Sequence, residues 1–516
     1  MIRMVLRTFL VFSLLAGWDM FLLYHHPGAD ALHSKPVIAA YVIFEAVLYG
    51  MVFAGLGCML GRRMKWVLVP VFWAILLFEF IETFVNAKFG MTIGGEWIIL
   101  LVTSSRMEIG EFVRGTVLTS IVPVIIGFVL AILIGFWCCR WTWKCETETS
   151  RRCGSCEREG GLFKGGKNGA FLLRLAVGLI LILPIKIAHS TLVKSGRKAM
   201  FASIVQDTLT TYRKQSCLKA CLSPVVEGNV CIKECTPPLL GVLIIGERAT
   251  RNRWGLYGYK NPTTPLISAL KGEDCELIVF KDVKAAGLRT FEAMVKMFTG
   301  ATDEDPLAVN PPFAAVINKA GYYSSLISAQ GHWATLDCYE DLLFHSCDKR
   351  IFLGDVEGLA PGYDERTLPF LKDEIAKSTG RATLAFLHWV GSHYPYHLRY
   401  PKGVFGRQDW DDYDNTILYT DMQLGKVVSM LKETKRPSFM IYISDHGESP
   451  DSSTWRDATD KDCWEIPLVM WFSREYASKF PECIDTLRSK STKSLKADRV
   501  SELFLIAAGI EFSPAL

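Results

Sequence analysis

The sequence has no hydrophobic run after Ile187 that is long enough to cross a bilayer, and it has no internal repeat or low-complexity tract. No small-residue cleavage site follows its first apolar run, which predicts an anchor rather than a removed signal peptide. The net charge is only +4 over 516 residues and lies mainly in two loops, so it does not indicate a nucleic-acid partner. At 50% hydrophobic, with a mean hydropathy of +0.21, the chain is too apolar for one soluble domain and too polar for a pure membrane bundle.

Five apolar runs in the first third of the chain are each near the ~20 residues that a membrane-spanning helix needs. They are Val5–Tyr24, Val37–Leu60, Trp66–Val85, Val117–Cys139 and Ala170–Ile187. Lys and Arg cluster in the loops 61–65 and 140–167, and such residues near span ends stay on the cytoplasmic side. We therefore expect a transmembrane domain over 1–190 in a bacterial inner membrane, with the C-terminal half in the periplasm.

A segment with paired Cys-x3-Cys motifs, residues 191–238, is predicted to link the two halves. The pairs Cys217/Cys221 and Cys231/Cys235 are typical of two helical turns facing each other. They favour the disulfides Cys217–Cys235 and Cys221–Cys231, although spacing alone leaves the other pairings open.

Strand-like apolar runs alternate with helical patterns over residues 239–516, which predicts an α/β domain with a mostly parallel sheet between helices. In such sheets ligands gather at the carboxyl ends of the strands. Glu247, His388, Asp445 and His446 all follow strand-like runs, so we expect them at one edge of the sheet.

Two carboxylates and an imidazole at that edge suit zinc, or less well manganese, with a position left open for substrate. A metal there would need a nucleophile beside it. Thr290 is a candidate because it lies between Gly287 and a helical run, FEAMVKMF, whose N-terminus would favour an anion. The alternative is that Thr290 only caps that helix.

Five motifs together resemble the membrane-anchored phosphoethanolamine transferases, a branch of the alkaline phosphatase and sulfatase superfamily. They are IIGERATRNRWGLYGYKNPTTP (Ile244–Pro265), FKDVKAAGLRTFEAMVKMF (Phe280–Phe298), LHWVGSHYPYHLRYP (Leu387–Pro401), YDNTILYTD (Tyr413–Asp421) and IYISDHGES (Ile441–Ser449). The resemblance covers the whole chain, and it implies a five-helix membrane domain followed by a sulfatase-like α/β domain.

The resemblance implies that Glu247, Thr290, Asp445 and His446 bind one zinc ion, with a second ion possible, and that Thr290 is also the nucleophile. His393, in GSHYP, looks like the histidine that contacts the phosphoryl group, a second metal or the leaving group.

His388 is a further catalytic candidate, with packing on its strand as the alternative. For Asp414 and Asn415 we prefer a helix cap to a site role. Glu448 is expected to orient His446.

Three departures from the family pattern stand out. Ala286 and Lys296 replace a Cys pair of the lipid A enzymes, so that disulfide is excluded. No histidine follows His446, where many members have one, and Arg248 replaces the usual Thr or Ser. These departures favour the glucan and core-oligosaccharide branches over the colistin-resistance branch.

The implied reaction moves phosphoethanolamine from phosphatidylethanolamine, a membrane lipid, onto Thr290 and then onto an envelope glycan or lipopolysaccharide acceptor, with the enzyme acting as a monomer. One alternative is a phosphoglycerol transferase of the lipoteichoic acid synthase type; another is a membrane pseudoenzyme. A sulfatase would need Cys or Ser in a C/S-x-P-x-R context, which is not found around Thr290.

Overall fold

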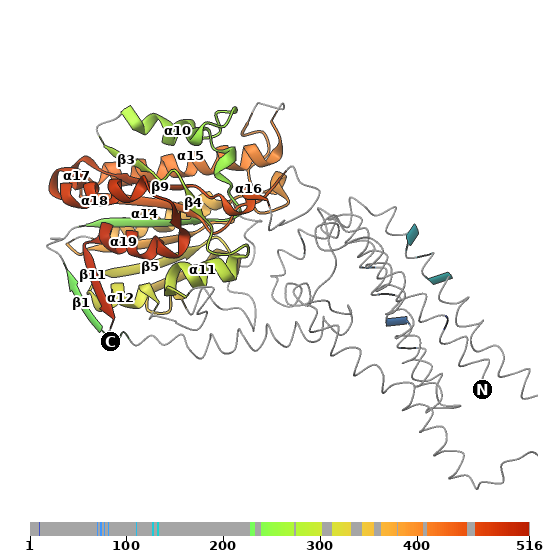
Figure 1. The fold of residues 1–516 in the computed structure, drawn as a ribbon, viewed down its shortest axis with the longest axis horizontal. Helices are drawn as coiled ribbons and strands as arrows, with labels where there is room; N and C mark the ends of the chain where they lie inside the picture. Colours follow the sequence, from blue (N-terminus) through green and yellow to red (C-terminus); the bar gives the residue numbers. More distant parts are fainter. Residues whose placement is uncertain are drawn as a thin grey trace, which may run out of the picture. The chain divides into compact units, whose positions relative to one another are not determined.

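The computed structural model describes residues 239–514, apart from 273–274, 302–311, 332–342, 356–362, 379, 406–409 and 451–459, together with 226, 228–232 and isolated helical residues between 10 and 133 (Figure 1). None of the helices within this described part combines the length and the apolarity needed to span a membrane. The five predicted spans lie outside the described residues, apart from those isolated positions, and the boundaries of the three predicted domains stay a prediction.

The centre of the described domain is a seven-stranded sheet with the strand order β3-β9-β8-β2-β7-β5-β6. Its strands are β2 (Leu240–Gly246), β3 (Glu276–Val279), β5 (Tyr323–Ser328), β6 (Lys349–Phe352), β7 (Thr383–His388), β8 (Ser438–Ser444) and β9 (Leu468–Phe472). All pairings from β8 to β6 are parallel, whereas β9 is antiparallel to both β8 and β3. The predicted mostly parallel sheet is therefore confirmed.

Helices cover both faces of this sheet, with α10 and α15 on one face and α11, α12 and α19 on the other (Figure 1). The α-helices are α10 (Pro265–Ala269), α11 (Thr290–Thr299), α12 (Phe313–Lys319), α14 (Leu368–Lys377), α15 (Asp412–Glu433), α16 (Lys461–Trp464), α17 (Arg474–Lys479), α18 (Pro481–Ser491) and α19 (Val500–Ala508). Short 3-10 helices are η6 (Arg251–Arg253), η7 (Gly255–Tyr257), η8 (Leu270–Gly272), η9 (Leu353–Asp355), η10 (Asp364–Thr367), η11 (Tyr396–Leu398) and η12 (Ala497–Arg499).

The central strands read as continuous apolar runs because both of their faces are buried. Along β2, Leu243 and Ile245 pack into one hydrophobic core, while Val242 and Ile244 pack into the core on the opposite face. Burial on both faces holds the strands in place, so the residues that follow their carboxyl ends have well-defined positions.

The predicted helical turn around Cys231 is wrong. Cys231 lies in β1 (Gly228–Ile232), which pairs antiparallel with β11 (Ile510–Pro514), the strand that ends the domain. Its thiol is free and exposed, so the predicted Cys221–Cys231 disulfide is also wrong. Cys217, Cys221 and Cys235 lie outside the described residues. A second small pair, β4 (Val283–Lys284) with β10 (Leu495–Lys496), is parallel.

Candidate metal centre and nucleophile

Two neighbouring strands end side by side and deliver three polar side chains to one point. β2 pairs with β8 up to Gly246 and Ser444, and the N–H of Asp445 donates to the carbonyl of Gly246 at 3.0 Å. Glu247 therefore follows one strand and Asp445 and His446 follow the next. All three are almost completely buried, and their ligand atoms lie within 4.8 Å of one another.

The hydrogen bonds of this group leave acceptor atoms pointing inward. His446 Nδ1 is 2.8 Å from the carbonyl of Gly447, which can only accept, so Nδ1 carries a proton and Nε2 is the ring nitrogen left to bind a metal. Nε2 lies 3.5 Å from Glu247 Oε1 and 3.4 Å from Asp445 Oδ2. Asp445 Oδ2 accepts no hydrogen bond, because the N–H groups of Arg248 and His446 both donate to Oδ1.

This donor set fits a divalent metal ion. Two carboxylates and one imidazole nitrogen are typical of zinc sites that keep a position open. The same surroundings also shift the pKa values of the two carboxyl groups in opposite directions. Burial acts to raise the pKa of Glu247, but its neighbours, His446 first and then His393 and the Arg248 guanidinium, hold it well below its ordinary value. Burial and the Glu247 charge raise the pKa of Asp445 to about 6.

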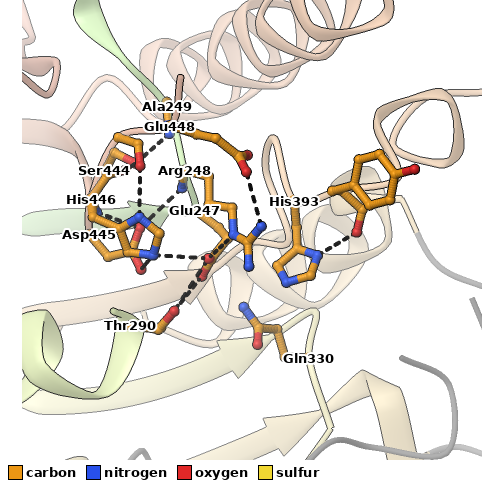
Figure 2. Close-up of polar contacts among 12 residues, drawn as sticks. Glu247, Arg248, Ala249, Thr290, Gln330, His393, Ser444, Asp445, His446 and Glu448 are labelled. Atoms are coloured by element: carbon orange, nitrogen blue, oxygen red, sulfur yellow. Dashed lines mark hydrogen bonds and ion pairs between the residues drawn. The ribbon is translucent and has the colours of Figure 1, made fainter. Parts of the chain in front are cut away.

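Thr290 is the first residue of α11, and its hydroxyl points at the acidic group (Figure 2). Thr290 Oγ1 donates to Glu247 at 3.1 Å from Oε2 and 3.3 Å from Oε1. The N-cap of α11 is Arg289, so the alternative that Thr290 only caps the helix is wrong. Lys296 Nζ donates to the carbonyl of Ala286 at 3.0 Å, so a hydrogen bond joins the two positions at which the family resemblance leads us to expect a cysteine pair.

His393 lies on the loop that follows β7, and its ring faces the same space (Figure 2). Gly391 takes φ +53°, and the N–H of Ser392 donates to the carbonyl of Glu247 at 2.9 Å, so this loop packs directly on the backbone of Glu247. Burial and the positive charge of Arg248 lower the pKa of His393 well below its ordinary value. The imidazole is therefore neutral at pH 7.

Asp364 holds the start of this loop through two backbone N–H groups. Its two oxygens accept from the N–H groups of Val390 at 2.7 Å and Gly391 at 3.0 Å, and burial raises its pKa to about 6. No sequence motif points to Asp364, because it lies outside the motifs and contacts the site through the backbone of the His393 loop.

The other sequence candidates occupy different positions. His388 is fully buried at the end of β7, with Nε2 3.2 Å from Nε2 of Gln330, which favours the packing interpretation; its catalytic role stays a prediction. Asp411, not Asp414, caps α15, and Asp414 instead pairs with Arg253 at 2.9 Å. Asn415 lies in the first turn of the same helix and is likewise not its cap.

Arg248 and Glu448 form an ion pair at 3.2 Å (Figure 2). The prediction that Glu448 orients His446 is therefore wrong, because Glu448 Oε1 accepts from the guanidinium of Arg248, and His446 is oriented by the carbonyl of Gly447. Arg248 also contacts Glu247, with Nε 3.2 Å from Oε1.

Comparisons with known proteins agree with this architecture. Phosphoethanolamine transferase EptC of Escherichia coli O18:K1:H7 is 28% identical over 267 residues, which are 46% of this chain and 46% of that protein. Phosphoethanolamine transferase EptA of Helicobacter pylori is 31% identical over 266 residues, 46% of this chain and 48% of that protein. The match thus spans about half the length of these curated relatives, and the resemblance to phosphoethanolamine transferases is confirmed.

The solved structure of the integral membrane protein lipooligosaccharide phosphoethanolamine transferase A from Neisseria meningitidis has a TM-score of 0.67 to this chain at 17% identity, covering 97% of this chain and 95% of that one. At this identity the likeness shows a common fold. The preference for particular branches of the family stays a prediction. The sulfatase family model matches residues 240–505, more than half of the 516 residues, and the chain therefore belongs to the sulfatase family.

Proposed function

We propose that this chain is a zinc-dependent phosphoethanolamine transferase that uses Thr290 as its nucleophile. The observation that carries the proposal is the hydrogen bond from the Thr290 hydroxyl to Glu247, at the edge of the buried group formed with Asp445 and His446. A nucleophile beside a candidate metal group at the N-terminus of a helix is the arrangement that attack on a phosphodiester requires. The names of the curated relatives support the choice of the transferred group.

Phosphatidylethanolamine is the proposed donor. In the first step a bond forms between Thr290 Oγ1 and phosphorus, and the bond from phosphorus to the diacylglycerol oxygen breaks. The hydroxyl proton passes along the hydrogen bond to Glu247, and the departing diacylglycerol oxygen takes up a proton from water. In the second step an acceptor hydroxyl gives its proton to His393 and attacks the same phosphorus, while the Thr290 oxygen leaves and takes its proton back from Glu247.

Zinc is the proposed metal, with Glu247, Asp445, His446 and the Thr290 oxygen as its ligands. When bound there, zinc would lower the pKa of the Thr290 hydroxyl and offset the charge that develops on the phosphoryl oxygens.

His393 is the proposed base for the second step. Its Nδ1 is 2.7 Å from the carbonyl of Tyr394, which can only accept, so Nδ1 carries the proton. Because burial lowers the pKa of this ring, Nε2 holds a lone pair at neutral pH. Such a nitrogen can accept the proton of an incoming hydroxyl group.

We also propose that the five predicted spans place the enzyme in a bacterial inner membrane with residues 239–516 in the periplasm. A donor lipid confined to the same membrane has a high effective concentration for a tethered site. Envelope glycans or lipopolysaccharide are the proposed acceptors.

The test uses the full-length chain in vesicles that carry either phosphatidylethanolamine or phosphatidylglycerol with a fluorescent acyl chain. Diacylglycerol released from phosphatidylethanolamine, and lost in Asp445→Asn, is the expected result. Release from phosphatidylglycerol alone would establish the phosphoglycerol transferase instead. No release by zinc-loaded protein from either lipid, in the presence of an acceptor extract, would identify a pseudoenzyme.

A further inference from the structure

Strand β8 has a polar residue at each end of an otherwise apolar run, SFMIYIS. Ser438 begins the strand, Ser444 ends it, and both residues are fully buried. A hydroxyl group that water cannot reach needs hydrogen-bond partners within the protein. The partners of the Ser444 hydroxyl lie in the two segments that carry the candidate metal ligands.

The Ser444 hydroxyl joins these two segments (Figure 2). Its Oγ accepts from the N–H of Ala249, two residues after Glu247, at 2.8 Å. The same Oγ donates to the carbonyl of His446 at 2.8 Å. One side chain therefore connects the segment that follows β2 to the segment that follows β8.

The connection lies where the sheet ends. The pairing of β2 with β8 stops at Gly246 and Ser444, and the N–H of Asp445 adds one more backbone hydrogen bond to Gly246. Beyond it, two backbone N–H groups of the first segment donate to side-chain oxygens of the second. Arg248 donates to Asp445 Oδ1 at 3.1 Å, and Ala249 donates to Ser444 Oγ. Asp445 is itself a candidate ligand, whereas Ser444 can be replaced without removing a ligand.

His446 is held at three of its polar groups. Its ring Nδ1 donates to the carbonyl of Gly447 at 2.8 Å, and its N–H donates to Asp445 Oδ1 at 2.6 Å. Its carbonyl accepts from Ser444. The first hydrogen bond orients the ring, and the other two fix the backbone from which the ring projects. Hydrogen bonds around a metal site orient the ligands in this way.

We propose that Ser444 is a positioning residue for the candidate zinc site and sets the placement of His446 relative to Glu247. Its Oγ both donates and accepts within the protein, so it acts through its neighbours. Ligands that are already in place need less ordering when the ion binds, and binding is tighter as a result. The proposal rests on the proposed function, which includes the zinc ion.

The test measures the Kd for zinc of the full-length chain, by competition with a chromophoric chelator, in wild type and Ser444→Ala. The substitution removes one oxygen atom and keeps every candidate ligand. We expect the Kd for zinc to rise by roughly ten- to a hundredfold, as for the loss of other hydrogen-bond partners around a metal site. Urea unfolding of the metal-free proteins measures stability separately.

Ser438→Ala is the matched control. Ser438 lies on the same strand and is equally buried, but its hydroxyl donates to the carbonyl of Arg436 at 2.8 Å, at the opposite end of β8 from the ligands. Both variants lose a buried hydroxyl group and should unfold at lower urea concentrations than wild type. Only Ser444→Ala should lose zinc affinity.

Two results would overturn the role of Ser444. One is an unchanged Kd for zinc in Ser444→Ala, because the hydroxyl would then contribute only to stability. The other is an equal rise in Kd in Ser438→Ala, because zinc affinity would then follow the stability of the whole domain.

The two proposals fail separately. If Ser444→Ala loses zinc affinity but zinc-loaded wild type releases no diacylglycerol from either lipid, the proposed function fails and the role of Ser444 stands. If wild type releases diacylglycerol and Ser444→Ala keeps both its zinc affinity and its kcat, the function stands and the role of Ser444 fails. A wild-type protein that binds no zinc overturns both.

Discussion

Replacing Gly391 by alanine should test how the loop that carries His393 positions Glu247. A Cβ at residue 391 would lie 2.7 Å from the carbonyl oxygen of Glu247 and 2.8 Å from its nitrogen, with φ fixed at +53°. An ordinary van der Waals contact begins at 3.4 Å. The distance from the new Cβ to the Glu247 carbonyl oxygen must therefore increase by 0.7 Å, through movement of the loop or of the Glu247 backbone. Both atoms belong to backbone, which cannot rotate out of the way.

The matched control is Gly321→Ala. Gly321 has φ +78°, and a Cβ there meets nothing within 4 Å. Both variants pay about 1–2 kcal/mol for a left-handed alanine and gain the same reduction in unfolded-chain entropy. Only Gly391→Ala adds an overpacking cost of about 1–3 kcal/mol. The difference between the two therefore measures the contact with Glu247.

Urea unfolding of both full-length variants gives the free energies, and diacylglycerol release gives the activity. Because a misplacement of about 1 Å can cost roughly a hundredfold in rate, we expect Gly391→Ala to be slowed at least about tenfold while Gly321→Ala turns over like wild type. Equal stability and equal activity of the two variants would refute the reasoning, since the loop would then not press on Glu247.

Three further changes test other parts of the structure. Asp421 accepts from two N–H groups at the start of α10, and burial raises its pKa from 3.8 to about 6. Between about pH 4 and pH 6 the folded state therefore binds a proton at Asp421 that the unfolded state has lost. The unfolding free energy of wild type relative to Asp421→Asn should fall by up to about 3 kcal/mol as pH rises from 4 to above 6. A difference in unfolding free energy that stays constant with pH contradicts this. Removing the proposed metal with a chelator should lower Tm, and added zinc should restore Tm in wild type but not in His446→Ala, as a calorimetric scan can show. A Tm that does not respond to zinc in either protein would contradict the proposed metal site. Tyr413→Phe removes the hydroxyl that hydrogen-bonds both the buried carbonyl of Arg248 and the N–H of Thr250. The free energy of unfolding, measured in urea, should fall by about 2 kcal/mol or more. Tyr400→Phe removes a more exposed hydroxyl and should lower it by less than about 1 kcal/mol.

The central strands could be predicted from the sequence because burial on both faces produces uninterrupted apolar runs. β2, β7 and β8 all coincide with such runs. The edge strand β6, KRIF, is half-buried and has no such run, so it could not be predicted this way. The antiparallel direction of β9 could not be predicted either, because β9 is as fully buried as the parallel strands of the sheet centre. The Cys-x3-Cys spacing predicts a helical turn at Cys231, but pairing of β1 with β11 gives this residue an extended conformation.

The candidate site could be predicted only as far as strand ends and motif resemblance reach. Glu247, Asp445 and His446 follow directly from the two strands that carry them. The partners of Arg248 and Glu448 could not be predicted, because they depend on a positive φ and on contacts between residues 200 positions apart. The sequence does not distinguish the cap of α15, because the segment around Asp411 holds several aspartates and only the register of the helix selects one.

Intact mass of the full-length protein after incubation with phosphatidylethanolamine tests the central claim most directly. Wild type should gain one phosphoethanolamine group, and Thr290→Ala should gain none. Thr299→Ala, at the other end of α11, should behave like wild type. Thr290→Ala should remain folded, because the lost hydrogen bond, about 1 kcal/mol, is partly offset by the higher helix propensity of alanine. An adduct that persists in folded Thr290→Ala would contradict the assignment of the nucleophile.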